Sequence, residues 1–180
     1  GLKTWNHEFD ANTPIGTVPM VNIVAEIAGT KSGVIVLSGH YETKRMDDIR
    51  FLGANDGASG VAVLAELGRH MPDFKSKYGV DFVLFDGEEL VYNNRRDKYF
   101  LGSEHFSKAY RGRRDKSIRY KYAVLLDMVG DRELHLFQEK NSMRWRDSRP
   151  LTKSIWQTAQ RLGVREFIPR RSEEHTSELQ

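Results

Sequence analysis

One histidine and four acidic residues of this sequence follow short apolar runs or lie just before a helical pattern, where side chains that do chemistry are often found. They are His40, Asp56, Glu88, Glu89 and Asp127. Imidazole nitrogen and carboxylate oxygen are ligands that suit zinc, although manganese and cobalt accept them too. Several carboxylates in one cleft repel one another unless a cation or a proton compensates them. If the fold brings these side chains together, the sequence predicts a divalent-metal site, with zinc as the expected ion.

The elements that must position these residues alternate between strands and helices. Runs of β-branched and other apolar residues predict strands, and apolar residues at spacings of three and four predict helices. We expect strands at 21–28, 33–38, 81–85, 122–126 and 134–137, the first two joined by a tight turn, and helices at 58–71, 103–110 and 151–162. This order predicts an α/β fold, a mostly parallel mixed sheet with helices on both faces. Ligands of such sheets bind beyond the carboxyl ends of the strands, where the five residues above are expected to meet.

The adjacent glutamates and the single Asp56 suggest a division of roles. Neighbouring residues of extended backbone point in opposite directions, so Glu88 and Glu89 are expected to do different things. One would bind metal, and the other would take a proton from water and return it to a leaving amine. Asp56 lies in the segment GANDGASG, and its two oxygens could bridge two metal ions about 3.5–4 Å apart. By itself, Asp56 could equally be the N-cap of the helix that follows.

Around these residues the chain resembles metallopeptidase family 28, the zinc aminopeptidases with co-catalytic metals, and their relatives the glutaminyl cyclases. The matching segments are VIVLSGHYETK, FLGANDGASGVAVLAEL, VDFVLFDGEE, YFLGSEHF and VLLDMVGD, in family order. The resemblance implies a zinc-peptidase fold, similar to phosphorylase and hydrolase folds, that acts on peptides. It also implies a secreted or periplasmic location, because relatives are often exported.

The resemblance also implies a role for each residue. It makes His40 and Glu89 ligands of one zinc, Asp127 a ligand of the other, Asp56 the bridge between them and Glu88 the general base. A non-proline cis peptide after Asp56 is implied as well.

Two departures from the family pattern stand out. Glu42 occupies the position two residues after the histidine, where the family usually has an aspartate that orients the imidazole. The family also places a last histidine ligand far downstream, whereas here His135 is too close in sequence to Asp127, and His175 lies in a tail, 171–180, that looks non-native. We therefore expect a partial catalytic domain at 1–170, incomplete at the C-terminus. Its cofactor is expected to be zinc, one or two ions, but this chain as it stands is expected to hold one zinc or none and to be weakly active or inactive.

Composition excludes several other classes of protein. The chain has 180 residues and a formal net charge of +3, too small a surplus for the broad basic surface that nucleic acids require. It has no cysteine, which removes disulfides, thiol nucleophiles and cysteine zinc sites. Neither a membrane span nor a signal peptide is evident. The sequence does not indicate an oligomeric state.

Three functions remain open from the sequence. The first is a zinc-dependent aminopeptidase-like hydrolase that releases N-terminal residues from peptides. The second is a single-zinc glutaminyl-peptide cyclotransferase, favoured by the insertion LVYNNRRDK at 90–98. The third is an inactive binding domain on the same scaffold.

Overall fold

We describe a computed structural model of the chain over residues 2–46, 48–89, 98–115 and 117–172. The chain forms two compact units, Gly1–Gly130 and Asp131–Gln180. The first unit contains all five residues singled out above, and most of the segments that resemble family 28.

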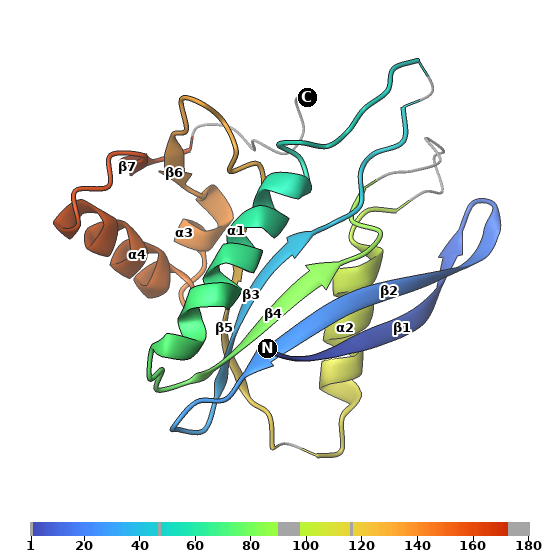
Figure 1. Ribbon diagram of the computed structural model, residues 1–180, viewed down its shortest axis with the longest axis horizontal. Coiled ribbons are helices and arrows are strands. Elements are labelled where there is room, and N and C mark those ends of the chain that lie inside the picture. Colours follow the sequence, from blue (N-terminus) through green and yellow to red (C-terminus); the bar gives the residue numbers. More distant parts are fainter. Residues whose placement is uncertain (1, 47, 90–97, 116, 173–180) are drawn as a thin grey trace. The chain divides into compact units, whose positions relative to one another are not determined.

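A five-stranded mixed sheet forms the centre of the first unit, in the order β1-β2-β4-β3-β5 (Figure 1). Its strands are β1 (Lys3–Thr13), β2 (Gly16–Ile27), β3 (Val34–His40), β4 (Gly79–Phe85) and β5 (Tyr120–Leu125). β4 pairs in parallel with β3, and β3 in parallel with β5. β1 and β2 form an antiparallel hairpin, and β2 also pairs with β4 in the antiparallel direction. The predicted mixed sheet is confirmed, and its parallel part is the part that carries His40 and Asp127.

The N-terminal part of the sheet differs from the prediction in two ways. β2 and β3 follow each other in sequence but do not pair, because β4 lies between them. The first five residues of β4 are buried, and a strand of this kind is stable only at the centre of a sheet. β1 was not predicted because its sequence, KTWNHEFDANT, is mostly polar and buries only Phe9 and Ala11 fully.

One helix covers each face of the sheet (Figure 1). α1 (Ala58–His70) ends just before Pro72, as predicted, and a short 3-10 helix, Met71–Asp73, follows it. On its face, Leu64 packs with Val80 and Phe82. α2 (Leu101–Gly112) covers the opposite face, where its Phe106 packs with valines of β2, β3 and β4. The alternation of side chains along each strand sends successive residues to the two cores and confirms helices on both faces.

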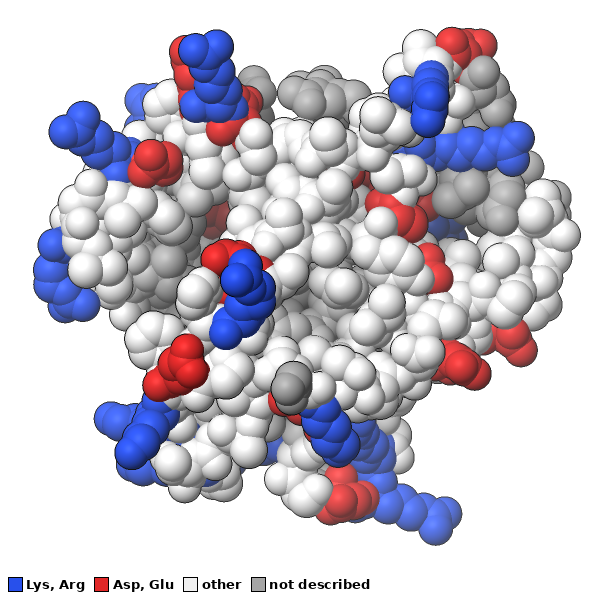
Figure 2. Space-filling view, viewed as in Figure 1, with Lys and Arg blue, Asp and Glu red and all other residues white. Residues whose placement is uncertain are grey.

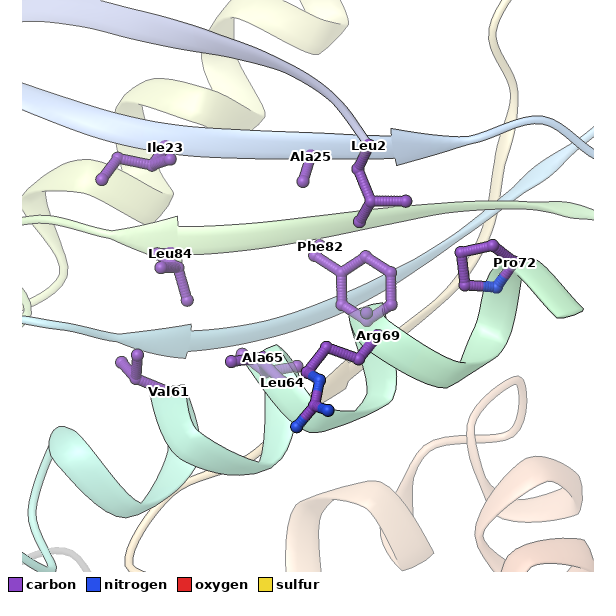
Figure 3. A pocket seen from close by; sticks show the side chains of 11 residues that line it. Leu2, Ile23, Ala25, Val61, Leu64, Ala65, Arg69, Pro72, Phe82 and Leu84 are labelled. Atoms are coloured by element: carbon purple, nitrogen blue, oxygen red, sulfur yellow. The ribbon is translucent and has the colours of Figure 1, made fainter.

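An apolar groove of about 510 Å³ lies between α1 and the strands β2 and β4 (Figure 3). Leu2, Ile23 and Phe82 line the sheet side, and Val61 lines the helix side. Arg69 is its one charged lining residue, and the middle of this face carries few charged side chains (Figure 2). The groove shares no lining residue with the five candidate residues, so it is not where the predicted chemistry takes place.

The second unit is a small α/β arrangement. It consists of β6 (Leu136–Gln138), α3 (Lys140–Arg144), α4 (Arg149–Arg161) and β7 (Phe167–Arg171). The indole of Trp156 on α4 donates hydrogen bonds to the carbonyl oxygens of Leu136 and Ile168, at 3.1 and 2.9 Å, and so ties the helix to both strands. The predicted strand and helix are present, whereas α3 and β7 were not predicted. Within the described residues, no helix is both long and apolar enough to cross a membrane.

Candidate metal centre

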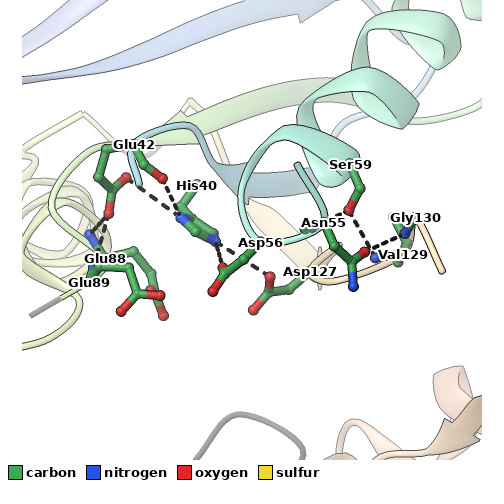
Figure 4. Close-up of polar contacts among 10 residues, drawn as sticks. All are labelled: His40, Glu42, Asn55, Asp56, Ser59, Glu88, Glu89, Asp127, Val129 and Gly130. Atoms are coloured by element: carbon green, nitrogen blue, oxygen red, sulfur yellow. Dashed lines mark hydrogen bonds and ion pairs between the residues drawn. The ribbon is translucent and has the colours of Figure 1, made fainter. Parts of the chain in front are cut away.

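The carboxyl ends of the three parallel strands bring the candidate residues to one edge of the sheet (Figure 4). His40 is the last residue of β3 and lies opposite Phe85 at the end of β4. Asp127 follows β5, whose Leu125 pairs with Ser38. Asp56 comes from the loop before α1. The predicted convergence of these side chains is therefore present in the structure.

His40 lies at the centre of this group and is almost fully buried, with 2% of its side chain exposed. Its Nε2 atom is 3.0 Å from Oδ1 of Asp56 and 3.4 Å from Oδ1 of Asp127. Neither contact has hydrogen-bond geometry, so Nε2 of His40 and Oδ1 of Asp127 have no hydrogen-bond partner among the described residues. Buried polar atoms are rarely left unpaired, and two such atoms beside a carboxylate oxygen of Asp56 are the arrangement expected around a cation.

The spacing of these atoms fits zinc. In a tetrahedral site, zinc–ligand distances of about 2.0–2.1 Å place neighbouring ligand atoms about 3.3–3.4 Å apart. The two distances from Nε2 of His40, 3.0 and 3.4 Å, are close to this value. Burial opposes a charge on the ring, yet the carboxylates of Asp127, Glu42 and Glu88 raise the pKa of His40 to about 11. Without a metal, a proton on His40 therefore compensates the acidic residues, and a metal ion would take over this role.

Glu42 orients both His40 and the two glutamates. Its backbone carbonyl oxygen accepts a hydrogen bond from Nδ1 of His40 at 3.1 Å, which leaves Nε2 free to face the carboxylates. Its side-chain Oε1 accepts from the backbone N–H groups of Glu88 and Glu89, the latter at 2.9 Å. Its Oε2 lies 3.7 Å from Nδ1 of His40. The carboxylate of Glu42 therefore lies near the ring of His40, but it is the backbone carbonyl of Glu42 that accepts the hydrogen bond from the ring.

Asn55 and Ser59 hold the loop of Asp56 against the loop of Asp127, a task that the sequence analysis did not assign. The backbone N–H of Gly130 donates to Oδ1 of Asn55 at 2.7 Å, and that of Val129 donates to the Ser59 hydroxyl at 3.0 Å. Both residues belong to the segment GANDGASG, whose polar positions flanking Asp56 were the available signal.

The backbone at Asp56 differs from two of the expectations. The N-cap of α1 is Gly57, and no side chain caps the helix, so the alternative role of Asp56 as an N-cap is wrong. The implied cis peptide after Asp56 is also wrong, because no peptide bond of the described residues is cis. Gly57 makes the turn with a φ of 89° instead, and a Cβ there would lie 2.8 Å from the carbonyl oxygen of Glu42. Glycine at this position lets the loop approach His40 closely.

Glu88 and Glu89 follow β4 by a turn at Gly87, and their environments differ. Burial, together with the negative charges of Glu89, Asp127 and Glu42, raises the pKa of Glu88 to about 7, although His40 opposes the shift. Burial and the neighbouring Asp56 carboxylate raise the pKa of Glu89. The side chain of Glu88 can share a metal with those of His40 and Glu42, whereas Glu89 lies beside Asp56.

Two groups of side chains lie close enough to share one ion among the described residues. They are His40 with Asp56 and Asp127, and His40 with Glu42 and Glu88. Glu89 belongs to neither group, and the neighbouring charges that act on it include those of Asp56 and His40. The pairing of His40 with Glu89 on one zinc, which the resemblance implied, stays a prediction. Of the downstream histidines, His135 belongs to the second unit, and His175 lies outside the described residues.

A mixed sheet that gathers a histidine and several carboxylates at the ends of its parallel strands defines a metallohydrolase-like class of protein. The family model of Peptidase family M28 matches residues 22–177, and the chain therefore belongs to this family.

Both branches of the family occur among the relatives. The glutaminyl-peptide cyclotransferase of Drosophila melanogaster is 32% identical over 130 residues, which cover 69% of this chain and 36% of that protein. A probable zinc metalloprotease of Pyrenophora teres f. teres is 28% identical over 172 residues, covering 89% of this chain and 35% of that protein. The chain thus spans about a third of the length of these curated relatives.

Solved structures show the same two branches. The crystal structure of the glutaminyl cyclase of Fimbriiglobus ruber is 33% identical with a TM-score of 0.86, covering 96% of this chain and 62% of that one. That of a leucine aminopeptidase precursor of Bacteroides thetaiotaomicron is 27% identical with a TM-score of 0.80, covering 96% and 63%. The fold is that of the family's zinc peptidases and glutaminyl cyclases.

Proposed function

We propose that this chain is part of a zinc enzyme that acts on the N-terminal residue of peptides and hydrolyses the first peptide bond. The observation that carries the proposal is the set His40, Asp56 and Asp127, whose ligand atoms have the spacing of a zinc site. A further carboxylate beside Asp56, that of Glu89, supports a second metal position. Such paired sites with a shared carboxylate suit two-metal hydrolysis.

The residues of the site would have two kinds of role, metal binding and proton transfer. His40, Asp56 and Asp127 would hold one zinc, and Asp56 and Glu89 would contribute to a second. When bound, zinc polarises the peptide carbonyl and makes water easier to deprotonate. Glu88 would accept the proton of the attacking water and pass it to the departing amine. Its pKa of about 7 suits this task, because a group that titrates near the working pH can both take up and release a proton.

The Glu42 side chain would keep Glu88 and Glu89 in their different roles. Its Oε1 binds the backbone N–H groups of both residues, so the peptide between them cannot rotate without breaking a hydrogen bond to a charged acceptor. The two side chains therefore stay apart, one at the proton-transfer position and one beside Asp56.

Glutaminyl-peptide cyclisation is the second candidate, and the similarity to cyclotransferases of fly and bacterial origin favours it. In that reaction the α-amine of an N-terminal glutamine attacks its own γ-amide and ammonia leaves. Glu88 would carry a proton from the amine to the ammonia. The same residues would thus serve both reactions. Most of the insertion that resembles the cyclases, residues 90–97, lies outside the described residues.

One assay separates these reactions. The complete gene product, loaded with zinc, is given a peptide that begins with leucine and one that begins with glutamine, and products are followed by mass spectrometry. Release of free leucine supports hydrolysis. Loss of 17 mass units from the glutamine peptide alone, the ammonia of the cyclisation just described, would contradict it and establish the second candidate. Zinc binding without either product would support a binding domain.

A further inference from the structure

Asn22, on β2, is fully buried and uses its whole side-chain amide in hydrogen bonds. Its Oδ1 accepts from the backbone N–H of Asp86 at 3.0 Å. Its Nδ2 donates to the carbonyl oxygen of Gly102 at 3.0 Å and lies 3.1 Å from Nδ1 of His7 on β1. One side chain therefore joins two strands, the turn after β4 and the first turn of α2.

These partners fix both the amide and the histidine ring. A backbone N–H can only donate and a carbonyl oxygen can only accept, so Oδ1 must face Asp86 and Nδ2 must face Gly102. The second hydrogen of Nδ2 then points at His7, whose Nδ1 has to be the unprotonated nitrogen of the ring. Burial, with smaller contributions from His105 and Arg113, lowers the pKa of His7 and favours this neutral form.

The turn that Asn22 holds is the one that carries Glu88 and Glu89. The carbonyl oxygens of Asp86, Gly87 and Glu88 accept hydrogen bonds from Gly102, Leu101 and Phe100, at 2.9, 2.8 and 2.9 Å. Oδ2 of Asp86 also accepts from the backbone N–H of Val21, next to Asn22, at 2.9 Å. Every one of these contacts restrains the backbone that leads to the two glutamates.

Gly102 allows this close packing. A Cβ at that position would lie 2.2 Å from the carbonyl oxygen of Asp86 and 2.3 Å from Oδ1 of Asn22. The start of α2 and the turn can therefore approach Asn22 only because residue 102 has no side chain.

We propose that Asn22 is a positioning residue for Glu88 and Glu89, that it acts through Asp86, and that it needs the hydrogen-bond acceptor that Nδ1 of His7 supplies. The inference rests on the proposed function for the roles of the two glutamates. It does not depend on whether the reaction is hydrolysis or cyclisation, because both would use Glu88.

The test compares two substitutions of His7. Asparagine carries an oxygen at the position of Nδ1, so His7→Asn keeps an acceptor for Asn22, whereas His7→Leu removes it. Asn22→Asp removes the donors of the amide, and Asn12→Asp, at an exposed position of β1, is the matched control. Amide hydrogen exchange, followed by NMR in the 180-residue chain, reports on residues 86–89 and 100–102, with Val36 and Val83 as references for the core.

We expect His7→Leu and Asn22→Asp to speed exchange at 86–89 roughly tenfold relative to the core, the effect of one lost hydrogen bond. His7→Asn and Asn12→Asp should stay close to the wild type. Equal acceleration in the core, an unchanged turn, or a His7→Asn variant no better than His7→Leu would each overturn the proposal. If Asn22→Asp does not fold, the two His7 variants still decide.

Zinc affinity separates this proposal from the proposed function. Where the wild type binds zinc, we expect His7→Leu to weaken zinc binding by about tenfold, as is typical when a residue that holds a metal ligand in place is lost. His7→Asn should bind zinc about as tightly as the wild type. A complete gene product that binds no zinc, with the exchange results as expected, would contradict the proposed function and still support the role of Asn22 in holding the turn.

Discussion

Nε2 of His40 lies 3.0 Å from Oδ1 of Asp56, yet the two atoms do not form a hydrogen bond. The contact is as short as a hydrogen bond but lacks its direction, as expected for two ligands of one ion. Asp127 approaches the same nitrogen at 3.4 Å from another strand. Because His40 ends β3 and Asp127 follows β5, the site depends on the parallel pairing of these two strands.

The first prediction concerns the metal itself. We expect His40→Ala to weaken zinc binding by more than about 100-fold, because it removes a ligand of the metal. Loss of a residue that only supports a ligand typically costs about 10–100-fold. His70→Ala is the control, since His70 is exposed at the end of α1 and pairs there with Glu66 at 2.9 Å. Competition with a chromogenic chelator measures both affinities. Equal affinities in the two variants would show that His40 is not a ligand.

Binding of zinc should release protons. The pKa of His40 is raised to about 11, so the ring is protonated at pH 7.5 in the metal-free protein, and a metal ligand has to give up that proton. We expect about one proton from His40 for each ion bound at its site. Calorimetric titrations with zinc in buffers of different ionisation enthalpy measure this number. A heat that is independent of the buffer would contradict the assignment.

Glu88 and Glu89 should give opposite results when each is replaced by glutamine. Glu88→Gln removes the proton carrier and is expected to lower kcat about 10²–10⁴-fold with little change in zinc affinity. Glu89→Gln should weaken zinc binding, because a carboxylate next to Asp56 is lost. Steady-state kinetics of the complete gene product and a zinc titration provide the two readouts. The reverse pattern would exchange the two roles.

Asp81 should make stability depend on pH, away from the metal centre. Burial raises its pKa above 3.8, even though the Tyr120 hydroxyl donates to Oδ2 at 2.8 Å. The folded chain therefore holds this proton more tightly than the unfolded chain, and its contribution to stability falls as the pH rises above 3.8. Asp81→Asn has no such titration.

The stability difference between Asp81→Asn and the wild type should accordingly shift in favour of the variant between pH 4 and pH 7. Urea unfolding at the two pH values measures it. A difference that does not change with pH would show that Asp81 has an ordinary pKa in the folded chain. The comparison between pH values is insensitive to any constant cost of placing an amide beside Tyr120.

Local sequence determined much of the fold and the identity of the site. The conformations of β3, β4, β5 and α1 could be predicted from their own residues. Apolar runs indicate strands buried on both faces, and apolar residues at spacings of three and four indicate a helix buried on one face. The types of His40, Asp56 and Asp127 already pointed to a metal. β1 was missed because its polar residues alternate with few apolar ones, and its pairing partner, β2, is what makes it a strand.

Only the tertiary structure decided which residues meet. The placement of β4 between β2 and β3, and the grouping of His40 with Asp56 and Asp127, depend on contacts between segments far apart in sequence. So do the hydrogen bonds of Glu42 to two backbone amides and the amide of Asn22 that joins four elements. Local propensity acts over a few residues, whereas a hydrogen bond or a ligand set is fixed by distances of about 3 Å that the chain reaches only once it has folded.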